Sequence, residues 1–89
     1  MHYEIERTNN FRFQYSKLEL KMKRFVEDAV EKIKENPYEL QGKITYLSRK
    51  KEGAMYRYRM PGAHLMYIII EKDDKKSTVV VLSNIKTLR

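Results

Sequence analysis

Apolar residues in the first third of the chain recur at helical spacing. They fall mostly three or four positions apart, which places them on one side of an α-helix. The residues concerned are Leu18, Met22, Phe25, Val26, Ala29, Val30 and Ile33. The pattern predicts an amphipathic helix whose apolar side packs against another layer of the protein.

Short-range signals mark the ends of this helix. Ser16 and Glu19 have the spacing of a capping box, which predicts Ser16 as the N-cap. Asn36-Pro37 ends the helix, because proline lacks an amide donor and disfavours helical geometry in the residue before it. The prediction is one helix over residues 17–35, or two helices with a break, the first beginning at the two phenylalanines upstream.

Strand patterns occupy the remainder of the chain. Residues 2–8 alternate, with Tyr3 and Ile5 on one side, and Thr8-Asn9-Asn10 reads as a turn. Further strands are expected at residues 54–60, 63–71 and 77–83, and the less regular 43–50 is expected as a strand or an extended loop. Connections are expected at Lys51-Glu52-Gly53, at Pro61-Gly62 and at the polar residues 72–76, and residues 84–89 are expected at the surface.

This order of elements predicts an α+β fold. Short turns imply antiparallel pairing of neighbouring strands. We therefore expect a single two-layer domain over residues 1–89. In it, the N-terminal strand and one long helix or helical hairpin pack on a mostly antiparallel sheet of about four strands. Alternation along 54–60 places Tyr56 and Tyr58 on one face of that sheet, and Arg57 and Arg59 on the other.

Composition narrows the class of protein. The 89 residues include 42% hydrophobic residues and no cysteine, so the chain suits a small domain with neither disulfides nor a thiolate nucleophile. The longest apolar run, residues 65–70, is too short to span a membrane, and the first residues do not resemble a signal peptide. We expect a cytoplasmic protein that has no membrane partner.

The net charge of +7 belongs entirely to the second half of the chain. Residues 1–42 hold eight acidic and eight basic side chains, whereas residues 43–89 hold eleven basic and four acidic ones. Such an imbalance is typical of proteins that meet a polyanion. Nucleic acid, an anionic membrane surface and an acidic protein all fit the charge; we favour RNA or DNA phosphates.

No signature for a phosphate loop, a metal site or an acyl-transfer triad occurs in the sequence, so neither metal nor cofactor is expected. Cations and tyrosines instead share neighbouring strands. Arginine forks fit phosphates, tyrosines stack on unpaired bases, and a histidine near neutral pH acts as acid or base. We therefore expect Arg49, Lys50, Lys51, Tyr56 and Tyr58 to bind RNA, and Arg57, Arg59 and His64 to carry catalysis. Ordinary alternatives are solvated arginines, a surface histidine and tyrosines that fill the core.

The chain resembles the RelE/ParE toxin superfamily of toxin–antitoxin systems. The residues that carry the resemblance are Asn36-Pro37, Leu40-Gln41-Gly42, Tyr56-Arg57-Tyr58-Arg59, Pro61-Gly62, Leu65-Met66-Tyr67 and Val79-Val80-Val81-Leu82. The resemblance implies a toxin that inhibits translation by cutting ribosome-bound mRNA without metal, leaving a cyclic phosphate. It also implies a cognate antitoxin as partner. Members of the ParE branch instead poison DNA gyrase.

Two positions depart from the family pattern. His64 stands where the family usually has arginine. Where the family continues into a basic turn and a C-terminal tyrosine or histidine, this chain offers Lys86, which we take as catalytic, and Arg89, which we take as RNA-binding. The stretch 43–53 is also longer than usual. The alternatives are therefore a non-catalytic or gyrase-targeting member of the same fold, or an unrelated small basic RNA-binding module.

Overall fold

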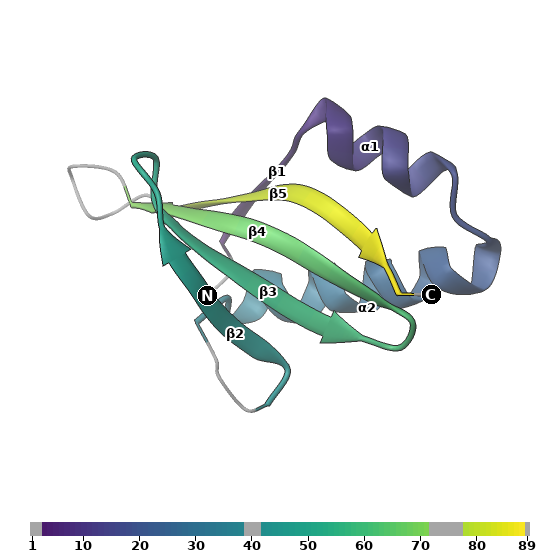
Figure 1. Ribbon diagram of the computed structural model, residues 1–89. Helices are drawn as coiled ribbons and strands as arrows, with labels where there is room; N and C mark the ends of the chain where they lie inside the picture. Colours follow the sequence, from purple (N-terminus) through teal and green to yellow (C-terminus); the bar gives the residue numbers. More distant parts are fainter. Residues whose placement is uncertain (1–2, 39–41, 72–77, 89) are drawn as a thin grey trace.

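The computed structural model describes residues 3–38, 42–71 and 78–88 (Figure 1). In chain order the elements are β1 (Glu4–Arg7), α1 (Asn9–Ser16), α2 (Leu20–Glu35), β2 (Ile44–Arg49), β3 (Ala54–Met60), β4 (Ala63–Glu71) and β5 (Thr78–Thr87). The predicted loop at 72–76, the Leu40-Gln41 pair of the family pattern, His2 and Arg89 lie outside the described residues.

The strands form one sheet in the order β1-β5-β4-β3-β2. β1 pairs with β5 in parallel, and the other neighbours are antiparallel. The α+β prediction of two layers is confirmed. The sheet has five strands rather than four, because residues 44–49 pair with β3 instead of forming a loop.

The helical segment is a hairpin of two helices, as the second alternative stated, but its predicted cap is wrong. Ser16 is the last residue of α1, and its hydroxyl donates to the Phe13 carbonyl at 2.7 Å. Thr8 is the N-cap of α1, where its hydroxyl accepts from the Phe11 amide at 3.0 Å. The turn predicted at Thr8-Asn9-Asn10 is therefore the start of a helix, and α2 begins after Glu19 without a side-chain cap.

One face of the sheet, here called the inner face, packs against the helices. Figure 1 shows α2 behind the sheet and α1 beside β5. The buried helix residues are Phe11, Val26, Ala29, Val30 and Ile33, and they form one core with Ile44, Tyr58, Met60, Ala63, Leu65, Tyr67, Ile69, Val80, Leu82 and Ile85. The alternation predicted for β3 is confirmed, since Tyr58 and Met60 are buried and Arg59 is exposed.

The last strand runs further than predicted. A strand ending at Ser83 was expected, but β5 continues to Thr87 through a bulge at Ser83. β1 pairs only with residues up to Leu82, and α1 covers the edge beyond that point. The Thr8 hydroxyl donates to the Ser83 carbonyl at 3.1 Å, and the side-chain oxygen Oε1 of Gln14 accepts from the Ile85 amide at 2.6 Å. These contacts hold the end of β5 beside β4.

The turn between β2 and β3 is closed by a residue that must lack a side chain. Lys50 and Gly53 exchange two backbone hydrogen bonds of 2.7 and 3.2 Å around Lys51-Glu52. A Cβ atom placed on Gly53 would lie 2.2 Å from the Ile69 carbonyl oxygen, which belongs to the backbone of β4. The hairpin and β4 come this close only because residue 53 is glycine.

We expect Gly53→Ala to lower the free energy of unfolding by about 1–3 kcal/mol, because the strands must separate to admit the methyl group. Urea denaturation followed by circular dichroism measures this change. Glu52→Ala, at the exposed neighbouring position, is the control and should stay within about 0.5 kcal/mol of wild type. An unchanged midpoint for Gly53→Ala would show that this close approach is not as described.

Candidate functional site

Four cationic or titrating side chains meet on the face of the sheet opposite the helices, here called the outer face. Strand register places Arg59 opposite His64, and His64 opposite Lys86, so the three form a row across β3, β4 and β5. Directly opposed residues point to the same side and have Cα atoms about 4.5–5.5 Å apart. Arg57 lies two residues before Arg59 on the same face, about 7 Å along β3. These four residues are the cationic cluster.

Neither helix covers the outer face. Its central residues Met55, Met66, Ile68 and Val81 are only partly buried, although their neighbours on the inner face are fully buried. The cationic cluster therefore adjoins an open apolar surface. A sheet face of this kind is suited to binding a partner or an extended ligand.

The cluster changes the acid–base behaviour of its histidine. Burial lowers the pKa of His64 below its ordinary value, and the positive charges of Arg57, Arg59 and Lys86 lower it further. The imidazole is therefore mainly neutral at pH 7. A neutral imidazole among cations is able to accept a proton, which is the property of a general base.

Arg57 carries an unsatisfied donor. Its Nε is buried and has no hydrogen-bond partner among the residues that the structure describes. A buried donor without an acceptor costs about 1–3 kcal/mol, and such groups often mark functional sites. A phosphate oxygen is an acceptor of the appropriate charge and geometry for this guanidinium.

The other residues expected to bind RNA lie away from this cluster. Lys50 and Lys51 are in the hairpin turn at the opposite end of β3, about 20 Å from Arg59 at roughly 3.3 Å per residue. Arg49 pairs with Ala54, on the inner-face side of the sheet. Tyr58, 5% exposed, belongs to the core, which is the ordinary alternative named for the tyrosines.

Tyr56 is on the same inner face as Tyr58 and is partly buried. It stacks on Tyr67 with ring centroids 5.8 Å apart. Neither tyrosine shares a face with the cationic cluster. The structure thus brings together all four expected catalytic residues and separates them from the described residues that were expected to bind RNA.

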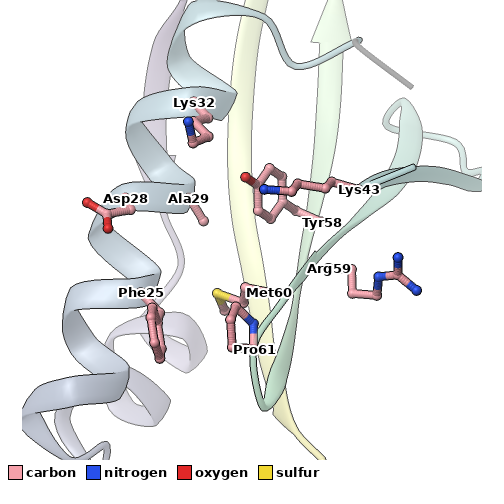
Figure 2. Close-up of a pocket in the computed structure, with 9 residues that line it drawn as sticks. All are labelled: Phe25, Asp28, Ala29, Lys32, Lys43, Tyr58, Arg59, Met60 and Pro61. Atoms are coloured by element: carbon pink, nitrogen blue, oxygen red, sulfur yellow. The ribbon is translucent and has the colours of Figure 1, made fainter. Parts of the chain in front are cut away.

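A groove of about 540 Å³ lies on the inner side, between α2 and β3 (Figure 2). On the helix side, Phe25 and Ala29 lie opposite Met60 and Pro61 of the sheet layer. The polar residues that line the groove are Asp28, Lys32, Lys43, Tyr58 and Arg59. The Arg59 guanidinium points away from α2 in Figure 2. Its amide donates to the Lys43 carbonyl at 2.6 Å. Sequence reasoning did not identify Lys32 and Lys43 as lining residues of one groove, because α2 and the start of β2 come together only in the tertiary fold.

Across residues 3–38, 42–71 and 78–88, no three histidine or carboxylate side chains gather in a way that would hold a metal ion. No helix in the described part of the chain is both long and apolar enough to cross a membrane.

Solved structures with a similar fold include toxin–antitoxin complexes and a toxin. A chain of the archaeal RelE–RelB complex from Pyrococcus horikoshii superposes with a TM-score of 0.78 at 16% identity, over 98% of this chain and 96% of that one. A chain of the toxin–antitoxin complex RelBE2 from Mycobacterium tuberculosis gives 0.72 at 21% identity, over 99% and 100%. The YoeB/ParE toxin from Agrobacterium tumefaciens gives 0.72 at 13% identity, over 97% and 99%.

No protein-family model and no curated protein matches the sequence. The likeness therefore lies in the three-dimensional structure. The chain has the fold of the RelE/ParE toxin superfamily, over nearly its whole length. The fold predicted from the degenerate motifs is thereby confirmed.

Proposed function

We propose that the protein is the toxin of a toxin–antitoxin pair and a metal-independent endoribonuclease that cuts ribosome-bound mRNA. One observation carries the proposal: the row Arg59, His64 and Lys86, with Arg57 beside it, on the open face of a RelE/ParE fold. The site supplies a base, an acid and two anion-binding groups. These suffice for cleavage by the 2′-hydroxyl of the RNA itself.

Each residue of the cationic cluster has a role in this reaction. Neutral His64 removes the proton of the 2′-hydroxyl, whose oxygen then attacks phosphorus. Arg57 and Arg59 stabilise the negative charge that grows on the non-bridging oxygens. As the bond from phosphorus to the 5′-oxygen breaks, the Lys86 ammonium gives that oxygen a proton. The products are a 2′,3′-cyclic phosphate and a 5′-hydroxyl, and proton exchange with water restores both groups.

The outer face is also suited to an inhibitor. Two of the structural neighbours were solved as complexes of a toxin with its antitoxin, and a third is the RelE toxin of E. coli with an antitoxin peptide. An antitoxin segment with acidic and apolar side chains would match the cations and the apolar centre of this face. Such a pair acts on the translation machinery, so we place it in the cytoplasm.

Expression from an induced promoter tests the function. We expect growth to stop and mRNA to be cut at translated sites, with cyclic phosphate ends. The control is a variant with Arg57→Ala and Arg59→Ala, which should permit normal growth at equal protein level. Normal growth of cells that express the wild-type chain would reject the proposed toxin activity. Arrest with intact mRNA and impaired supercoiling by gyrase would favour the ParE-like alternative.

A further inference from the structure

Five tyrosines form a connected cluster at the β2 edge of the molecule. Tyr56 is central: its ring stacks on Tyr67 at 5.8 Å and meets Tyr46 at 5.6 Å and Tyr38 at 6.3 Å, both edge to face. Tyr3 meets Tyr38 at 6.2 Å, again edge to face. Aromatic pairs at these separations stabilise each other by about 0.5–1.5 kcal/mol beyond their burial. The rings therefore hold one another in place.

The cluster is buried at one end and open at the other. Tyr67 has no exposed surface, and its hydroxyl donates to the Pro37 carbonyl at 2.8 Å. Tyr46 is 50% exposed and Tyr38 is 37% exposed. The open rings thus rest on a fixed base. A fixed, open aromatic ring is a platform on which a planar ligand stacks without first ordering the side chain.

The open end of the cluster lies one strand away from the cationic cluster. Tyr46 pairs with Tyr56 and therefore points to the inner face, whereas the preceding Thr45 pairs with Arg57 on the outer face. β2 is an edge strand, so no further strand separates Tyr46 from solvent. An extended chain bound at Arg57 must therefore pass around the β2 edge to reach Tyr46 on the other face.

Charge selects the class of ligand. Exposed Lys43 and Arg49 are on either side of Tyr46 along the chain, and residues 43–89 together carry the whole excess of +7. The carboxylate of Glu71 lies near Tyr38, since burial and, after it, the negative charge of Glu71 raise the pKa of the Tyr38 hydroxyl. A stacking ring between cations matches the alternating bases and phosphates of a single strand.

We propose that Tyr46, supported by Tyr56 and Tyr38, stacks on an unpaired base of a single-stranded RNA that passes around the β2 edge from the cationic cluster. This inference rests on the proposed function for its choice of RNA. It replaces the expected stacking by Tyr58, which is buried. It also gives the protein a sequence-independent contact with the RNA strand at a distance from the scissile bond.

The test uses oligonucleotides that no 2′-hydroxyl can cleave. A short 2′-O-methyl RNA strand and an abasic strand with the same number of phosphates are titrated against the wild type and three variants. We expect Tyr46→Ala to weaken binding of the base-containing strand about 5- to 100-fold and to leave the abasic strand unaffected. The salt dependence should not change, since no phosphate contact is lost. Tyr46→Phe should bind like wild type.

Phe13→Ala is the matched control, because Phe13 is an aromatic residue of similar exposure (62%) on α1. It should not affect binding of either strand. Equal affinity of Tyr46→Ala and wild type for the base-containing strand would overturn the proposal. The exposed tyrosines would then be better explained as a surface that binds a protein partner. An equal loss for both strands would also overturn it. Because binding alone is measured, a base-dependent loss supports stacking even if the wild-type protein proves non-toxic.

Discussion

His64→Ala is expected to slow single-turnover cleavage of ribosome-bound mRNA by about 100- to 10,000-fold, the usual contribution of a positioned general base. Binding should change little, because the neutral imidazole contributes no charge to the cationic cluster. The pH dependence gives a second measurement. Since burial and the neighbouring cations lower the pKa of His64 below its ordinary value of 6.5, the wild-type rate should be level near pH 7 and fall only at more acidic pH.

A modified substrate separates the base from the acid. When sulfur replaces the 5′-oxygen at the scissile bond, the leaving group departs without a proton. Lys86→Ala should then recover most of the wild-type rate, whereas His64→Ala should remain slow. His64→Gln keeps the size of the side chain and should be as slow as alanine. Cleavage by His64→Gln at the wild-type rate would remove the histidine from the chemistry.

The double variant Arg57→Ala with Arg59→Ala is expected to weaken RNA binding about 10- to 100-fold, because two charge-assisted contacts are lost. The slope of log affinity against log salt should become shallower by about 0.7 for each lost phosphate contact on a single strand. Filter binding or fluorescence anisotropy across a salt series measures both quantities.

The matched control removes two positive charges elsewhere. Lys21 and Arg24 are exposed on α2, in the helical layer. Lys21→Ala with Arg24→Ala lowers the net charge by the same amount and should leave affinity nearly unchanged. If both double variants lose the same affinity, net charge alone drives binding and the outer face is not the RNA site.

Sequence periodicity was sufficient to predict the two layers and to assign the residues of β3 to the two faces of the sheet, because alternation along a strand maps directly onto burial. It was not sufficient for the helix start. Ser16 and Glu19 have the correct spacing for a cap, but Ser16 is the last residue of α1, and its hydroxyl bonds back to the Phe13 carbonyl instead of capping α2. The capping side chain belongs to Thr8, which is followed by two asparagines that resemble a turn.

The candidate site was predictable in part. Alternation placed Arg57 and Arg59 on one face, and the short Pro61-Gly62 turn placed His64 opposite Arg59. The position of Lys86 depends on a bulge at Ser83 and on α1 side chains that satisfy the edge of β5. Such contacts join residues about 70 positions apart, and no local pattern reveals them. The exposure of Tyr46 likewise follows from β2 being an edge strand.

The parallel pairing of β1 with β5 has a consequence for biosynthesis. Glu4 pairs with Val79, so β1 cannot pair until β5, about 75 residues later in the chain, has been synthesised. Contacts of such long range slow folding, since the intervening chain must be ordered before they form. The row that includes Lys86 likewise needs β5. A nascent chain therefore lacks the complete cationic cluster until β5 has left the ribosome.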